Sequence, residues 1–81
     1  MEMRFGKAVS TETLYEFVEL VGQGAYRQMF VQKGEFMASR RAQAMFPDIP
    51  AWQHRDDDNL HTSFYDPQMK RRRHFVLREV R

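Results

Sequence analysis

The first clear periodicity in the chain covers residues 11–21. Leu14, Phe17, Val18 and Val21 follow the i, i+3, i+4, i+7 spacing of one buried helix face. Ser and Thr at positions 10 and 11 are good residues to cap the start of a helix, and the glycine at position 22 is a natural stop. The pattern predicts a helix over residues 11–21.

The next segment, residues 25–38, fits two structures. As a helix over 25–32 it places Tyr26, Met29 and Phe30 on one face. As a hairpin it pairs residues 29–32 with 35–38 around a turn at Lys33-Gly34. We favour the helix. Residues 35–45 hold good helix formers and end before Pro47, which predicts a further helix there.

The remaining apolar residues alternate with polar ones, which is typical of strands. Weak alternation over residues 2–8 and clear alternation over 60–65 predict two strands, and residues 73–81 predict a last one after the Asp66-Pro67 turn. The two prolines and the acidic run between residues 47 and 59 predict an irregular segment. We therefore expect a small single α+β domain over residues 1–81. It would have two or three helices packed on a short antiparallel sheet with a C-terminal β-hairpin.

Composition narrows the class of protein. The chain has 81 residues, no cysteine and 42% hydrophobic residues. The lack of thiols excludes disulfides and thiolate metal sites, and the apolar content favours a folded core. No apolar run is long enough for a membrane helix or a signal peptide, so we expect a cytoplasmic protein with no membrane partner and no cofactor.

The net charge of +2 is small but unevenly distributed. Residues 60–81 hold six basic and two acidic residues, and four of the bases are consecutive, Lys70, Arg71, Arg72 and Arg73. Such a run at a hairpin tip can bind phosphates, and Arg40 and Arg41 on the predicted third helix would extend it. DNA or RNA binding is therefore one hypothesis, against the alternative of a solvated hairpin tip.

Two other features favour a protein partner. On the predicted first helix, Glu12, Glu16 and Glu19 form an acidic stripe opposite the apolar face, which could meet a basic groove. Phe46 and Trp52 flank a Pro-x-x-Pro spacing and would anchor a protein interface if they are exposed. The alternative for the stripe is an ordinary solvated face, and the alternative for the aromatic segment is that it folds back over the core.

Signals for catalysis and for metal binding are weak. The chain has no complete phosphate-binding loop, dinucleotide fingerprint or nucleophile elbow. A small basic ribonuclease using Arg71, Arg73, His74 and Tyr65 is the enzymatic alternative. His54, His61 and the intervening aspartates match no established ligand spacing, so we predict no metal site.

We favour a non-enzymatic protein-binding module, an adaptor or inhibitor of the kind found as phage or plasmid accessory factors. It would dock on a host protein or a nucleic-acid-handling complex. We reason that a dedicated nucleic-acid binder would carry a larger excess of bases than thirteen against eleven acids. Because the last strand is apolar on both faces, a homodimer through the sheet that covers Val76 and Val80 is a further hypothesis.

Overall fold

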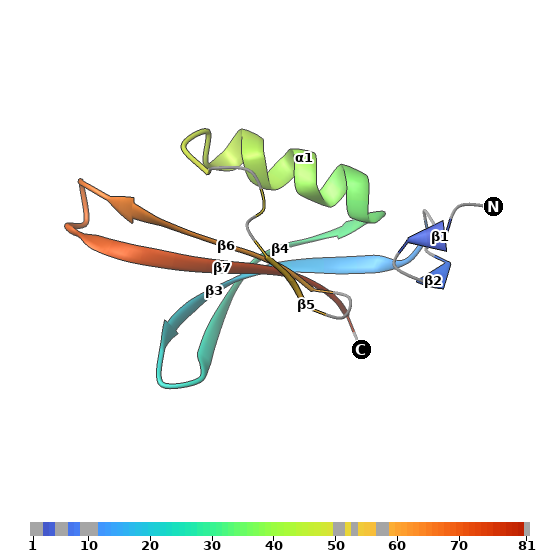
Figure 1. Ribbon diagram of the computed structural model, residues 1–81, viewed down its shortest axis with the longest axis horizontal. Helices are drawn as coiled ribbons and strands as arrows, with labels where there is room; N and C mark the ends of the chain where they lie inside the picture. Colours follow the sequence, from blue (N-terminus) through green and yellow to red (C-terminus); the bar gives the residue numbers. More distant parts are fainter. Residues whose placement is uncertain are drawn as a thin grey trace.

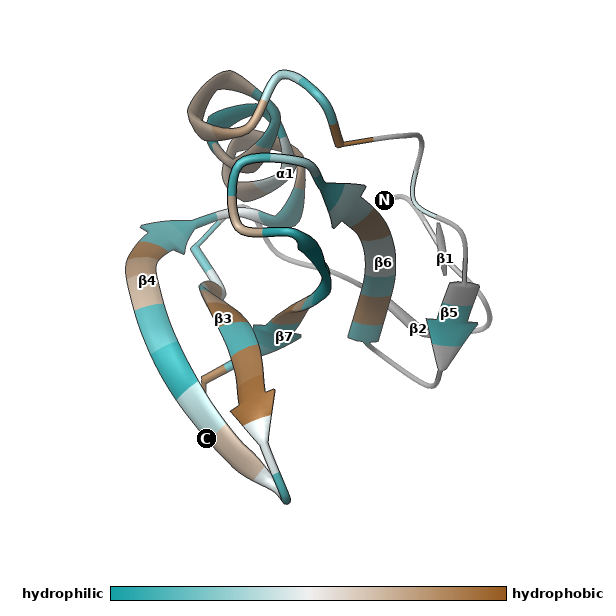
Figure 2. Ribbon diagram, turned by 90° about the vertical axis from the view of Figure 1, so that its left-hand side faces the viewer, coloured by the Kyte–Doolittle hydropathy of each residue, from teal (hydrophilic) through white to brown (hydrophobic). Residues whose placement is uncertain are grey.

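The computed structural model describes residues 3–4, 7–8, 12–49, 52, 54–56 and 59–80. Its elements in chain order are β1 (Met3–Arg4), β2 (Lys7–Ala8), β3 (Leu14–Gly22), β4 (Ala25–Lys33), α1 (Glu35–Met45), β5 (His54–Asp56), β6 (Asn59–Asp66) and β7 (Arg71–Glu79). Strands β1 and β2 form a small ribbon, and the others form one antiparallel sheet in the order β4-β3-β7-β6-β5. Four of these five strands are long, and α1 lies across one face of the sheet (Figure 1 and Figure 2).

This architecture confirms a small α+β domain with a C-terminal hairpin, β6–β7. The expectation of two or three helices is wrong, since α1 is the one helix among the described residues. The predicted helix over 35–45 is confirmed at both ends. The strand predicted at 60–65 is confirmed as the core of β6, and the strand predicted at 73–81 is confirmed over residues 73–79, since β7 begins and ends two residues earlier. The single strand predicted over 2–8 is instead two short paired strands, β1 and β2. The segment predicted to be irregular contains the short strand β5.

The helix predicted over residues 11–21 is strand β3, which pairs with β4 on one side and β7 on the other. Phe17 and Val18 are both buried, although neighbouring residues of a strand point to opposite faces. Buried apolar residues therefore occur on both faces of β3, whereas Leu14 and Val21, which completed the helical spacing, are exposed. The pairing with two neighbouring strands therefore overrides a pattern that suits a helix equally well.

Neither structure considered for residues 25–38 is correct. Ala25–Lys33 is a strand that forms a hairpin with β3, and Glu35 already lies in α1. The turn is Gln23-Gly24, where both residues have positive φ (38° and 82°). Two positive φ values suit the right-handed twist of a two-residue hairpin, and a glycine at the second position favours them. This Gln-Gly pair was the missed signal for the hairpin.

The core lies between α1 and the sheet. Small residues of the helix, Ala38 and Ala42, are fully buried and allow its backbone to lie close to the strands. Below them runs a row of aromatic rings: Phe17 stacks on Phe30 at 5.2 Å and on Phe75 at 5.1 Å between ring centroids. Partly buried side chains complete this cluster, namely Met29, Phe46, Trp52, Leu60 and Phe64. The sheet face that carries these rings is called here the helix face, and the opposite one the open face.

The two long hairpins separate at one end of the sheet. Strands β3 and β7 pair from Tyr15 opposite Glu79 to Leu20 opposite His74. Beyond this point β3 continues with β4, and β7 continues with β6, so the β3–β4 and β6–β7 hairpins diverge as two arms (Figure 1). We call the space between the arms the fork.

Candidate functional site

The fork is a groove of about 350 Å³. Residues of both arms line it: Leu20, Val21, Gly22, Ser63, Arg71, Arg72, Arg73 and His74. None of these lining residues is acidic. Lys70, Arg71 and Arg72 are exposed at the start of β7, next to the turn that joins it to β6. The groove therefore has a positively charged wall on the β6–β7 arm.

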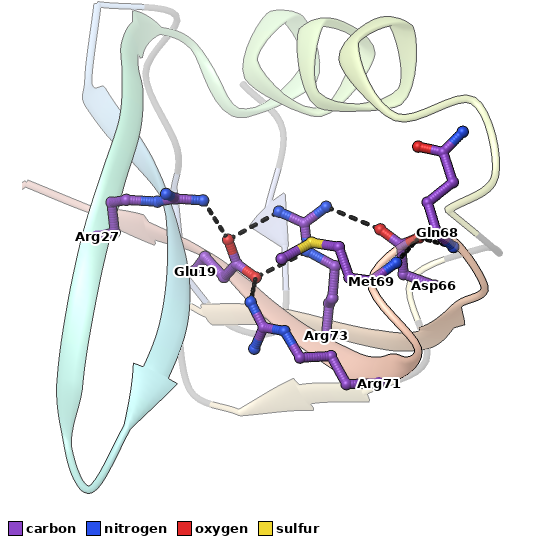
Figure 3. Close-up of polar contacts among 7 residues, drawn as sticks. All are labelled: Glu19, Arg27, Asp66, Gln68, Met69, Arg71 and Arg73. Atoms are coloured by element: carbon purple, nitrogen blue, oxygen red, sulfur yellow. Dashed lines mark hydrogen bonds and ion pairs between the residues drawn. The ribbon is translucent and has the colours of Figure 1, made fainter.

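A buried carboxylate forms the base of the fork on the helix face (Figure 3). Glu19 is 0% exposed and accepts two hydrogen bonds from Arg73, at 2.8 Å from Nε and 2.9 Å from Nη2. Arg27 of β4 donates a third at 2.8 Å, and the Arg71 guanidinium lies 3.7 Å away. We call Glu19, Arg27, Arg71, Arg73 and Asp66 the Glu19 network. It ties β3, β4 and β7 together where the two arms part.

Arg73 is held on every side. Its Nη1 donates to Asp66 at 3.1 Å, and its guanidinium lies 5.0 Å from the ring centroids of both Phe46 and Phe75. Asp66 also accepts the backbone N–H groups of Gln68 and Met69, which shapes the β6–β7 turn. The planar, delocalised guanidinium suits both the two-pronged pairing and the ring contacts. Arg73 is thus a structural residue that is not available to an external ligand.

Register explains why these charges meet. Glu19 lies opposite Phe75, two residues from Arg73 along β7, so both charged side chains project from the helix face. They lie beyond the aromatic core, at the end where the sheet splits. A buried charge is tolerated there because partners satisfy its oxygens.

The network shifts the ionisation of its members. Hydrogen bonds from Arg73 are the largest influence on the Glu19 carboxyl and hold its pKa below the usual 4.5, against the opposing effect of burial. The same hydrogen bonds raise the pKa of Arg73. On the open face, burial raises the pKa of Glu16, but hydrogen bonds from Arg78 and Gln28 outweigh it and leave that pKa lowered.

These shifts make stability sensitive to acid. A carboxyl group whose pKa is lowered by folding stabilises the fold above its unfolded pKa, and this contribution is lost as pH falls through the folded value. We expect the midpoint of thermal unfolding to be level from pH 7 to about 5 and to fall as the pH drops below the usual value of 4.5. Calorimetry across this range measures it. A midpoint unchanged down to about pH 3 would contradict the ion-pair assignment.

Two further acids are neutralised in the same way. The buried Glu35 is paired with Arg55 at 3.0 Å, and the partly buried Glu16 with Arg78 at 2.8 Å. By contrast, Arg27 and Arg71 stay 57% and 44% exposed although both face Glu19. At the fork, Glu19 and its partner Arg73 are buried, while Arg27 and Arg71 reach the surface. The surface at the fork is consequently more positive than the nearly balanced composition indicates.

The predicted acidic stripe of Glu12, Glu16 and Glu19 does not exist. It depended on a helix, whereas Glu16 and Glu19 project from opposite faces of a strand. Glu12 precedes β3 and pairs with Lys33 at 3.3 Å. Since Glu19 is buried under arginines, these three carboxylates present no common surface to a partner.

Phe46 and Trp52 pack against the core, which agrees with the alternative that their segment folds back over it. Phe46 lies 4.8 Å from Phe75 between ring centroids and covers Arg73. Trp52 packs edge-on to Phe17 at 6.3 Å, and its Nε1 donates to Ser39 Oγ at 2.6 Å. Both side chains are half-buried, so neither is the exposed anchor that the protein-docking hypothesis requires.

The basic residues divide into two sets. Lys70, Arg71 and Arg72 lie at the fork, whereas the helix arginines make contacts elsewhere. The Arg41 guanidinium lies 4.4 Å from the ring centroid of Phe30 and donates to the Val31 carbonyl at 3.4 Å. Arg40 lies over Phe36 at 5.8 Å. The predicted single patch is thus reduced to three residues at the β6–β7 turn.

The residues of the ribonuclease hypothesis do not converge. Arg71 and Arg73 face Glu19 on the helix face, while His74 and Tyr65 project from the open face. No cluster of three or more metal-ligating side chains occurs among the described residues. Some of the residues considered as metal ligands lie outside the described part of the chain, namely Asp57, Asp58 and the side chains of His54 and Asp56.

No helix among the described residues is long and apolar enough to cross a membrane.

Comparisons with known protein families, curated proteins and solved structures gave no match. The interpretation of the fork therefore depends on its own geometry. The sequence indicated the basic wall of the fork, but nothing in it marked Ser63 and Leu20 as residues that line the groove. Only the pairing of β3, β7 and β6 brings them together.

The reason given for a homodimer is also weakened. Val76 lies on the open face as expected, but it is only 3% exposed within the single chain. Val80, at the end of β7, remains more exposed. A second copy is therefore not needed to bury Val76.

Proposed function

We propose that the chain binds nucleic acid through the fork. The observation that carries this proposal is the separation of charge: Glu19 is buried under arginines, and Lys70, Arg71 and Arg72 remain exposed beside a groove without acidic lining. The near balance of acids and bases in the whole chain does not describe the fork, because Glu19 is buried there and no acidic side chain lines the groove. Arginine and lysine at such a groove can neutralise phosphates, which supplies most of the affinity of nonspecific binders.

Charge removal at the fork tests the proposal. The variant Lys70→Gln/Arg72→Gln is expected to bind a labelled oligonucleotide more weakly and with a shallower salt dependence. Each lost contact to a single strand lowers the slope of log affinity against log salt by roughly 0.7, so two contacts lower it by about 1.4. Fluorescence anisotropy across a salt series measures both quantities. Arg71 and Arg73 are left in place because they face Glu19.

The matched control removes two charges elsewhere. Lys33→Gln/Arg40→Gln has the same net charge, but Lys33 is at the far end of β4 from its turn and Arg40 is on α1. It should keep the slope of the unchanged protein. Equal losses in both variants would show that only total charge matters. If polyglutamate displaces the labelled oligonucleotide as well as unlabelled oligonucleotide does, the partner is an acidic protein surface instead.

The adaptor or inhibitor function is a second candidate, carried by a different surface. Phe36 is 64% exposed and Met37 54% exposed on α1, which is unusual for such large apolar side chains. On this hypothesis a protein partner covers the outer face of the helix. Calorimetric titration of an identified partner should then show binding lost in Phe36→Ser and retained in Lys70→Gln/Arg72→Gln.

A further inference from the structure

We infer that the nucleic acid is single-stranded and that one base stacks on Tyr65 beside Arg72. This inference rests on the proposed function and adds the form of the ligand. It concerns the open face of the fork, where side chains other than the basic run contribute.

Tyr65 is an exposed aromatic residue of β6 that lies directly opposite Arg72, just outside the residues that line the groove. It is 55% exposed, whereas its neighbour in sequence, Phe64, stacks on Phe75 in the core at 5.7 Å. Register places Tyr65 directly opposite Arg72, so both side chains project from the open face. The Arg72 guanidinium reaches Ser63 Oγ at 3.2 Å, which confirms that it lies along this face. An aromatic ring and an exposed cation are thus side by side.

A second row of side chains crosses the sheet next to this pair. Tyr26, Leu20, His74 and Ser63 are opposite one another in successive strands β4, β3, β7 and β6. Three steps of about 4.8 Å between strands make this row roughly 14 Å long. Tyr26, at its far end, is 45% exposed and lies 4.7 Å from the Arg78 guanidinium. The row offers an extended chain a path across both arms of the fork.

This arrangement fits single strands better than duplexes. Binders of single strands combine a basic groove with aromatic rings on which bases stack, and they tolerate many sequences because every base has a flat face. In a duplex the base faces are already stacked on one another, so a side-chain ring on a sheet surface cannot reach them. A ligand that uses both Tyr65 and Arg72 must therefore present unstacked bases together with phosphates.

Three labelled probes separate the contributions. They are an oligothymidylate of about twelve nucleotides, within the site sizes usual for single-strand binders, its duplex with oligoadenylate, and an abasic strand of equal length. We expect the oligothymidylate to bind more tightly than either other probe. We expect Tyr65→Ala to weaken its binding by about five- to a hundredfold and Tyr65→Phe to keep it, since the ring supplies the stacking.

Each outcome has a distinct meaning. If all three probes bind equally, or Tyr65→Ala changes nothing while Lys70→Gln/Arg72→Gln still weakens binding, the single-strand inference is wrong and the proposed function survives. If no probe binds at low salt, both are wrong. Tyr65 is on the surface, so its variants should unfold at the same temperature as the unchanged protein, which circular dichroism verifies.

Discussion

Replacing Arg73 by Ala is expected to lower the free energy of unfolding by about 3–5 kcal/mol, because it leaves the buried carboxylate of Glu19 without its main partner. Arg27 still reaches Glu19, which places the expected loss near the lower end of that range. A domain of this length is stable by roughly 4–12 kcal/mol. Urea denaturation followed by circular dichroism should therefore show a large drop in midpoint, or a chain already unfolded without urea.

A double replacement distinguishes an unpaired charge from lost packing. Arg73→Met together with Glu19→Leu removes both ions and keeps apolar volume between the rings of Phe46 and Phe75. Replacing a buried ion pair by apolar residues is often neutral or stabilising, so we expect this variant to recover most of the stability. If it is no more stable than Arg73→Ala, the network does not act through charge compensation.

Replacing Phe75 by Ala is expected to cost about 3–5 kcal/mol through the cavity it leaves. Phe75 is fully buried and contacts the rings of Phe17, Phe46 and Phe64 as well as the Arg73 guanidinium. Its loss removes the ring that connects the aromatic row to the Glu19 network. Thermal or urea unfolding of the purified variant provides the measurement.

The control for this variant keeps more of the volume. Phe75→Leu should cost distinctly less than Phe75→Ala, since the cost of a core replacement increases with the cavity that remains. The exposed Phe36→Ala, on the outer side of α1, should change stability by no more than about 0.5 kcal/mol. A loss at Phe36 as large as at Phe75 would mean that the core has been placed wrongly.

The sequence predicted correctly those helices and strands whose pattern of residues fits only one kind of secondary structure. The helix over 35–45 is bounded by Gly34 and Pro47, and the alternation around residues 60–65 continues through β6. The prediction for β3 failed because its apolar residues fit the spacing of a helix as well as that of a strand with buried residues on both faces. No residue within β3 reveals that β7, more than fifty positions later in the chain, pairs with it.

The site was predictable in kind but not in detail. The run Lys70–Arg73 indicated a basic hairpin tip, and the hairpin is present. The sequence could not show that Arg73 turns inward while Arg72 turns outward, since this depends on which face of the sheet α1 covers. Nor could it show that Glu19 neutralises the inward arginine from another hairpin. Because the run includes the buried Arg73, replacing all four residues by alanine would confuse unfolding with loss of binding.

The most direct test of the nucleic-acid interface is to locate the ligand on the molecule. Amide chemical shifts of the labelled protein, recorded as oligothymidylate is added, report which residues sense it. We expect the largest changes at the groove residues Ser63, Arg72 and His74 and at Tyr65 opposite Arg72, and little change along α1. Changes concentrated at Phe36 and Met37, or no changes at any concentration, would contradict the proposal that this chain binds nucleic acid at the fork.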